Sequence, residues 1–222
     1  FIVLARKLFI MTARTILYLR IALGVITLIL SYRIYRIIME PIEFSAIKEK
    51  RYAEVTHRLE QLREAQLTFK TEYGKYAATF DELIPFLEYA QVNIIERKDS
   101  SFMAYNKVYQ TDMLKDTIIY RIIGQTSAKE KLINKNPELF EADFDATELR
   151  FIPFTNDTAE FKMATGFVDR NGVRVQVFEI IAPNTRFFAD IYQDYKAFIK
   201  NLRIDALIVG SLTEPTLSGN WK

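Results

Sequence analysis

The sequence predicts an α+β protein, in which an N-terminal transmembrane helix continues into a long amphipathic helix packed on a mainly antiparallel sheet. Three observations lead to this prediction. An uncharged apolar run begins at Ile21, apolar residues recur at heptad spacing over residues 52–73, and the pattern shifts towards a period of two from Val92 onward. The helical segments precede the strands instead of alternating with them, which is typical of α+β folds.

The apolar run over residues 21–38 is the candidate membrane anchor. Its first twelve residues carry no charge, and the rest adds only Arg33 and Arg36. About nineteen helical residues span about 28 Å, close to the thickness of a bilayer core, and the two arginines can extend to the headgroups. We therefore expect a transmembrane helix over residues 16–40, ended by Pro41. The residues assigned to the anchor are Ile21, Leu23, Val25, Leu28, Leu30, Arg33 and Arg36.

Two alternatives to an anchor stay open at this stage. The run would also suit a buried helix of a soluble core, although Arg33 and Arg36 would then lie in that core without evident partners. A cleaved signal peptide is the second alternative. The apolar run is long for one, and residues 31–34, which follow its most apolar part, residues 21–30, offer no small-x-small cleavage site.

The charges on the two sides of the run predict its orientation. Residues 1–20 contain four Arg and Lys and no acid, whereas the residues after the run mix both signs. The positive-inside rule favours a cytoplasmic N-terminal segment, residues 1–15, and an exported C-terminal domain. In a bacterium this means an anchor in the inner membrane and a domain in the periplasm. Because the sequence begins with Phe1, we expect either processing or a genuine start at Met11.

Composition narrows the classes of partner. Residues 1–41 hold six of the 30 Lys and Arg and one of the 28 Asp and Glu, which leaves 24 basic and 27 acidic residues and a net charge of −3 for the remainder. By charge, the exported part is not a nucleic-acid binder. The absence of cysteine excludes disulfides, thiol catalysis and cysteine metal sites.

The segment over residues 41–90 is predicted to hold the long amphipathic helix, then a short one. Gly74 is a typical C-terminal stop, and Thr79 with Glu82 forms the pattern of a capping box ahead of a helix over residues 81–89. The heptad seam of the long helix has two open interpretations: it lies on a sheet of its own domain, or it forms a coiled coil with a partner. The seam residues are Tyr52, Val55, Leu59, Leu62, Gln66, Phe69 and Tyr73.

Residues 91–210 are predicted to form the antiparallel sheet portion, followed by an irregular tail, residues 211–222, pinned by Trp221. Polar residues 98–101 are expected to form a turn, and Asn171-Gly172 is the preferred turn of a two-residue hairpin. One helix is predicted over residues 185–202. The predicted strands are residues 92–95, 102–109, 117–123, 149–154, 160–167, 173–181 and 206–209.

This order of parts resembles type IV pilins and the pseudopilins of type II secretion. The resemblance covers residues 20–90 and is carried by residues 63–66 (Arg-Glu-Ala-Gln), 73–76 (Tyr-Gly-Lys-Tyr) and 80–83 (Phe-Asp-Glu-Leu). It implies an envelope assembly component with a pilin-like core. The sequence departs from the pilin pattern at Ala5, where pilins carry a glutamate.

Residues that carry chemistry are few. His57 is the only histidine, so one chain cannot form a catalytic triad or a multi-histidine metal site. Asp190 and Asp194 share a helical face, which we interpret as a solvated one. An acidic cluster offers oxygen ligands for calcium but lacks the EF-hand spacing and its glycine, and we expect it to be a solvated loop. The cluster consists of Glu138, Glu141, Asp143, Asp145 and Glu148.

These observations together predict a single-pass inner-membrane protein that is not an enzyme and uses no cofactor or metal. We expect a structural or assembly subunit of a hetero-oligomeric envelope complex, related to secretion or to pili. The alternative is an accessory subunit of a transporter or translocon whose anchor contacts partner helices. The predicted partner contacts, apart from the lipid bilayer, are Tyr52, Leu59, Asn171, Gly172 and Trp221.

Overall fold

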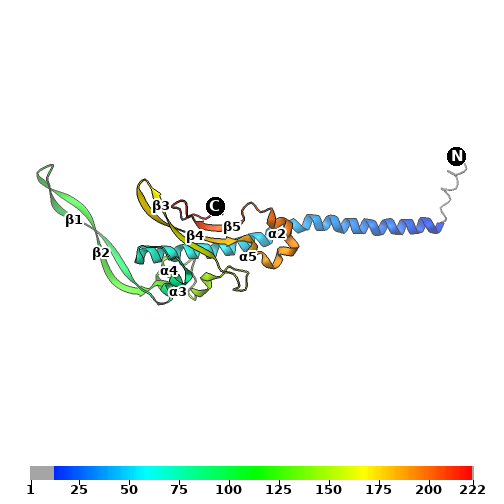
Figure 1. Ribbon diagram of the computed structural model, residues 1–222, viewed down its shortest axis with the longest axis horizontal. Helices are drawn as coiled ribbons and strands as arrows, with labels where there is room; N and C mark the ends of the chain where they lie inside the picture. The colour runs from blue at the N-terminus through cyan, green and yellow to red at the C-terminus, as the bar shows by residue number, and fades with distance from the viewer. Residues whose placement is uncertain (1–12, 222) are drawn as a thin grey trace. The chain divides into compact units, whose positions relative to one another are not determined.

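The computed structural model describes residues 13–221, and the fold is α+β, with a long N-terminal helix followed by antiparallel sheets (Figure 1). The chain divides into two compact units, Phe1–Lys50 and Arg51–Lys222. The predicted segment over residues 1–15 lies mostly outside the described residues.

Helix α2, Ala13–Tyr73, is one element of 61 residues that contains Pro41. The predicted continuation of the apolar helix into the long amphipathic helix is confirmed, whereas Pro41 does not end the first helix as expected. A proline inside a helix lacks one N–H donor and costs about 3 kcal/mol. Here the apolar run before Pro41 and the strong helix formers after it favour helix on both sides, and this preference outweighs the local cost.

Within the second unit, the heptad seam of α2 faces the core of the unit itself. Val55, Leu59, Leu62 and Phe69 are all buried, so a coiled coil with a partner through this seam is excluded. After Tyr73 the chain leaves the helix at Gly74, whose φ of 71° is left-handed and whose N–H donates to the Lys70 carbonyl at 2.8 Å. The predicted C-terminal stop is confirmed.

Helix α3, Phe80–Tyr89, has Thr79 as its N-cap, as predicted, and it buries Leu83, Phe86 and Leu87. The predicted capping box is not formed, because no side-chain bond caps the helix at Thr79. Instead the Glu82 carboxylate accepts from the N–H of Ala78 at 3.0 Å.

Strands β1, Gln91–Asn106, and β2, Thr111–Ser127, form a two-stranded antiparallel hairpin that is longer than predicted. The predicted turn over residues 98–101 is wrong, because these residues stay in the ladder, with Asp99 opposite Ile118 and Ser100 opposite Thr117. Strong β-formers in β2 supply a continuous partner for this polar stretch. The turn lies at residues 107–110 instead.

The connection after the hairpin contains a helix that the sequence interpretation missed. Helix α4, Ala128–Lys135, opens with a complete capping box between Ser127 and Glu130. The predicted strand over residues 149–154 is wrong: the 3-10 helix η1, Thr147–Arg150, occupies its start, and only Phe151 makes an isolated bridge, to Glu160.

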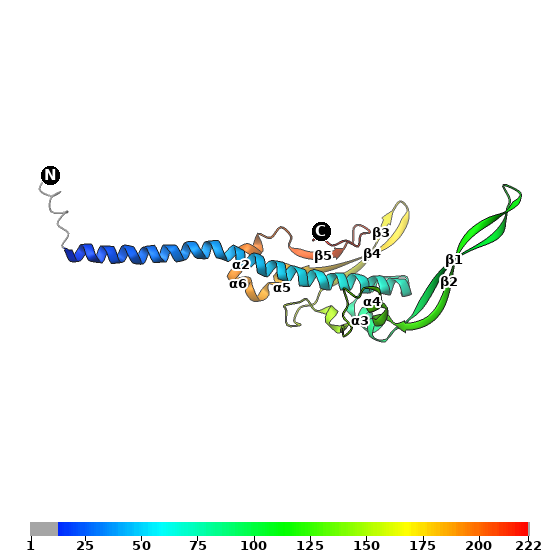
Figure 2. The ribbon, with the colours of Figure 1, turned by 180° about the vertical axis from the view of Figure 1, so that it is seen from behind.

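Strands β3, Lys162–Arg170, β4, Val173–Pro183, and β5, Ala206–Gly210, form the second sheet in the order β3-β4-β5 (Figure 2). The predicted hairpin is confirmed. Asn171 and Gly172 have φ values of 55° and 76°, as a type I′ turn requires.

The tail is held to β5 by Asn220. Its amide donates to the Ala206 carbonyl at 2.8 Å and accepts from the Ile208 N–H at 3.0 Å. The Trp221 ring lies against Gly219, where an added Cβ would come within 2.3 Å of it. The tail is irregular, as predicted, and the side chain of Asn220 binds it to β5.

The predicted single helix over residues 185–202 is broken into three pieces: α5, Asn184–Phe187, the 3-10 helix η2, Ala189–Ile191, and α6, Tyr192–Lys200. Asn184 begins this segment as a buried residue whose amide donates to the Ile204 carbonyl at 2.5 Å. The break positions Asp190 for a long-range ion pair, described next.

Arg51 fastens this broken segment to α2. Its guanidinium forms a two-bond ion pair with Asp190, with both N–O distances 2.6 Å, and it also donates to the Phe187 carbonyl. The guanidinium lies 4.9 Å from the ring centroid of Phe154 and 5.7 Å from that of Phe188. A planar cation between rings and a carboxylate is the geometry that arginine, but not lysine, provides.

We expect Arg51→Met to lower the free energy of unfolding by about 1–3 kcal/mol, since charged hydrogen bonds are lost and the Phe187 carbonyl loses a donor.

The hydrogen bond from Arg51 holds the pKa of Asp190 below its usual value. The pair therefore stabilises the fold above the ordinary aspartate pKa of about 3.9 and loses this effect as the pH falls through the lowered value. Urea unfolding at several pH values should show that the free energy of unfolding of Asp190→Asn falls less steeply towards acid pH than that of the parent chain. An equally steep fall in both would contradict the assignment.

Candidate anchor, acidic pocket and contact surfaces

The first unit contributes the candidate anchor. Among the described residues, α2 is the one helix that is long and apolar enough by length and composition to cross a membrane. Every residue from 15 to 38 is exposed. The Thr27 hydroxyl donates to the Leu23 carbonyl at 2.9 Å, so its polar group is satisfied inside the helix.

The predicted anchor residues all lie in this exposed helical stretch. The uncharged segment is bounded by Arg20 on one side and Arg33 on the other. Thirteen helical steps separate these two residues, which is about 20 Å along the axis. Extended arginine stems at both ends would widen the distance between the charged groups towards the thickness of a bilayer core.

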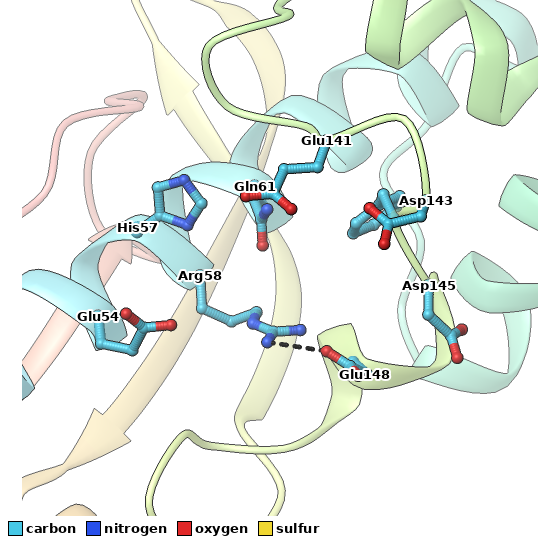
Figure 3. Close-up of a pocket in the computed structure, with 9 residues that line it drawn as sticks. Glu54, His57, Arg58, Gln61, Glu141, Asp143, Asp145 and Glu148 are labelled. Atoms are coloured by element: carbon cyan, nitrogen blue, oxygen red, sulfur yellow. Dashed lines mark hydrogen bonds and ion pairs between the residues drawn. The ribbon is translucent and has the colours of Figure 1, made fainter.

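The second unit contains an acidic pocket of about 320 Å³ that joins two predicted features (Figure 3). Helix α2 supplies Glu54, His57, Arg58 and Gln61. The facing loop and η1 supply four acidic residues of the predicted cluster. These residues are Glu141, Asp143, Asp145 and Glu148. Residues 80 or more positions apart in the sequence therefore line one pocket, which no local pattern indicated.

Several polar side chains that line this pocket are hydrogen-bonded to, or ion-paired with, other residues of the protein. Arg58 Nη2 lies 3.2 Å from Glu148 Oε2, and Gln61 donates to the Leu139 carbonyl at 2.8 Å. Asp145 accepts from both the N–H and the hydroxyl of Thr147, each at 2.8 Å, and the backbone bond lowers the pKa of its carboxyl. The loop is thus ordered by its own hydrogen bonds.

The pocket does not have the geometry of a metal centre. Within residues 13–221, no three His, Asp or Glu side chains come together in a way that could hold a metal ion. Glu138, the remaining member of the predicted cluster, is not part of the pocket lining. Asp190 is bound to Arg51, so it is not free to act with Asp194 as an acid–base pair.

Two of the predicted partner contacts belong to the interior. Leu59 has none of its surface exposed, and Tyr52 places its ring 5.8 Å from that of Phe187 and 6.1 Å from that of Phe188. Burial raises the pKa of the Tyr52 hydroxyl. Leu59 is therefore corrected from a contact residue to a core residue, and Tyr52, which is half-buried, packs against its own domain.

The other predicted contacts lie where a partner can reach them. Asn171 and Gly172 are exposed at the tip of the β3–β4 hairpin, and Trp221 is half-buried in the tail. A larger surface was missed: the β1–β2 hairpin exposes Met103, Leu114 and Tyr120 by 64–66% each. Its signal in the sequence is the run Thr-Ile-Ile-Tyr-Arg-Ile-Ile at residues 117–123, which predicts a strand with apolar residues on both of its faces.

No family model, curated protein or solved structure matches this chain. Its function is therefore inferred from the chemistry and exposure of its own residues.

Proposed function

We propose that this chain is a single-pass membrane protein whose extramembrane domain serves as a structural or assembly subunit of a bacterial envelope complex, related to secretion or to pili. The observation that carries the proposal is the exposed helical stretch over residues 15–38, which has no charge between Arg20 and Arg33. An exposed apolar helix of this length is unfavourable in water and favourable in a bilayer.

The proposed orientation has the N-terminus in the cytoplasm and the second unit in the periplasm, with the anchor in the inner membrane. Its support is the set of four Arg and Lys in residues 1–20, which contain no acid. The proposed export also agrees with a domain that contains no cysteine.

We also propose that the second unit has a pilin-like core, with the C-terminal part of α2 laid on the β3-β4-β5 sheet. One contact from α2 and two from Tyr76, three residues after its end, support this arrangement. The buried amide of Gln66 lies 2.8 Å from the sulfur of Met163 in β3, and the Tyr76 N–H donates to Gln176 in β4 at 2.8 Å. The Tyr76 ring also lies 4.7 Å from the ring of Phe178.

Gln66 provides a direct test of this core. Its amide spans the Ala77 peptide, donating to the carbonyl at 3.0 Å and accepting from the N–H at 2.9 Å. Gln66→Leu leaves both buried backbone groups unpaired, so we expect the free energy of unfolding to fall by about 1–3 kcal/mol. Chemical denaturation measures this change, and Gln125→Leu on the exposed hairpin should change it by less than about 0.5 kcal/mol. Equal stability of the two variants would contradict a stabilising role for the two hydrogen bonds between Gln66 and Ala77.

We propose that the domain works by contact and not by catalysis. The single histidine rules out a catalytic triad or a multi-histidine metal site within one chain, and two of the five carboxylates that line the pocket, Glu148 and Asp145, are bound to Arg58 and Thr147. The candidate contact surfaces are the two hairpin tips and the C-terminal tail.

The proposal is tested by extracting the native protein from membranes with a mild detergent, followed by size analysis and mass spectrometry of what co-elutes. We expect an assembly that contains other membrane proteins. Recovery of the chain in the soluble fraction, or of the chain with no other protein, would contradict the proposal.

The same preparation distinguishes the alternative, an accessory subunit of a transporter or translocon. In that case the anchor itself contacts partner helices. Charge reversal at Arg20 and Arg33 would then abolish the complex while the protein still inserts, whereas a complex held by the extramembrane domain would persist.

A further inference from the structure

The β1–β2 hairpin is a ribbon of two strands, with 16 and 17 residues, and within residues 13–221 no third strand pairs with it (Figure 2). A hairpin of two strands is at best marginally stable in water, because it lacks a hydrophobic face buried against a further layer. Nearly all its residues beyond the first few of β1 are exposed. The ribbon therefore requires a partner surface to be fully stabilised.

The strand register sorts the exposed side chains onto two unequal faces. Residues opposite each other in an antiparallel ladder share a face, and every second residue follows them. The pairs Ile95–Ile122 and Met103–Leu114 therefore lie on the same face. We define the apolar face by six of its residues. They are Ile95, Met103, Leu114, Ile118, Tyr120 and Ile122.

The opposite face is mainly polar and basic. It carries one acid, Glu96, and three basic residues, Lys98, Lys115 and Arg121. Its large apolar residues are Phe102, Met113 and Ile119. The apolar face also carries four charged residues, Arg97, Asp99, Asp112 and Asp116. The two faces therefore differ in the number of large apolar side chains, as expected of a ribbon covered on one side, and not in the number of charges.

The size of the apolar face matches a specific interface. Its six residues are exposed by 39–66%, and with side chains of this size the apolar surface is on the order of 600–700 Å². The pair Ser101–Asp116 separates Met103 and Leu114 from the other four residues. The total area of the six is close to the roughly 800 Å² per partner of a standard interface.

We propose that the apolar face binds the same face of a second copy of this chain, in register, about a two-fold axis along the ribbon. In this arrangement each β1 residue faces the β2 residue that is its own ladder partner, now contributed by the second copy. Ile95 then meets Ile122, and Met103 meets Leu114. The interface goes beyond the proposed function, because it does not depend on the membrane anchor.

The charged and polar residues of the same face fit this arrangement. Arg97 faces the ring of Tyr120 of the second copy, a cation–π pair. Ser101 faces Asp116 and Tyr105 faces Asp112, and in both pairs a hydroxyl meets a carboxylate. Asp99 faces Ile118 of the second copy and has its ion pair within its own strand, with Asp99 Oδ1 3.6 Å from Arg97 Nε. No like charges face each other directly. Turning the second ribbon end for end would instead gather the Asp99 and Asp116 side chains of both copies around the axis.

The first test is cross-linking of the full chain in detergent, with no native cysteine to interfere. Differently tagged Met103→Cys and Leu114→Cys chains are mixed and treated with a bis-maleimide of about 10 Å reach, the spacing of two packed sheets. We expect a product that carries both tags. The matched pair Ala104→Cys and Met113→Cys lies on the opposite face and should give little. Equal yields from the two pairs, or none from the first, would overturn the proposal.

The second test compares two isoleucines of the same strand. Ile122→Lys places a charge in the apolar face, and Ile119→Lys places one on the opposite face. The two side chains are similarly exposed, Ile122 by 62% and Ile119 by 50%. We expect light scattering of the full chain to show a dimer that Ile122→Lys weakens roughly tenfold or more and Ile119→Lys leaves nearly unchanged. A monomeric parent chain, or equal loss in both variants, would overturn the proposal. A dimer that survives Ile122→Lys would assign association to another surface, such as the anchor.

Discussion

Replacing Val25 and Leu28 together with aspartate is expected to move the protein from the membrane to the soluble fraction. Both residues lie in the exposed apolar stretch of α2, 51% and 72% exposed. A central charge in a transmembrane helix costs about 2.5–3.5 kcal/mol, and each lost apolar residue removes about 0.3–0.6 kcal/mol more. The double variant therefore loses about 6–8 kcal/mol of insertion free energy. Fractionation with an alkaline carbonate wash measures the outcome.

The matched control is the pair Val25→Ala and Leu28→Ala, which shortens the same side chains without adding charge. This variant should remain in the carbonate-resistant membrane fraction. If the aspartate variant stays there as well, or if the parent chain is itself released by carbonate, the helix does not anchor the protein.

Leu59→Ala is expected to lower the free energy of unfolding of the second unit by about 2–5 kcal/mol. Leu59 is fully buried on the seam of α2, together with Val55 and Leu62. Truncating a buried leucine loses its transfer free energy and leaves a cavity. Denaturant unfolding followed by circular dichroism measures the change.

Glu54→Ala is the control for Leu59→Ala, since Glu54 is exposed on the same helix and its loss should change stability by less than about 0.5 kcal/mol. The experiment also tests the assignment of the seam to the core of its own unit. A Leu59→Ala variant with unchanged stability but without its protein partners would make the seam a contact surface, contrary to its burial.

The parts of the fold that the sequence predicted are those determined by local chemistry. The Asn171-Gly172 turn follows from the left-handed backbone that both residues tolerate, and the end of α2 follows from Gly74. The seam of α2 follows from its spacing, because the burial of one helix face imposes a period on the sequence.

The parts that were missed depend on partners far away in the chain. Residues 98–101 look like a turn by themselves and become strand because β2 pairs with them. The segment after Asn184 has the spacing of one helix, yet it breaks where Asp190 meets Arg51, 139 positions away. Propensity is a weak prior that such tertiary contacts override.

The candidate sites also divide into those that follow from local sequence and those that depend on distant parts of the chain. The anchor was predictable, since a bilayer demands an uncharged run of a certain length. The partner contacts were predicted less well, because a seam residue such as Leu59 is equally suited to its own core and to another protein. The acidic pocket and the apolar face became evident only from the packing of α2 against its loop and from the register of β1 with β2.

The most direct test of the central claim, a membrane anchor with an exported domain, is cysteine labelling in intact spheroplasts. The chain has no cysteine, so Val108→Cys, at an exposed turn position, and Ala5→Cys each carry a single reporter. A membrane-impermeant maleimide should label the cysteine at position 108 in intact cells and the one at position 5 only after lysis. Equal labelling of both positions before lysis, or the reverse order, would contradict the account.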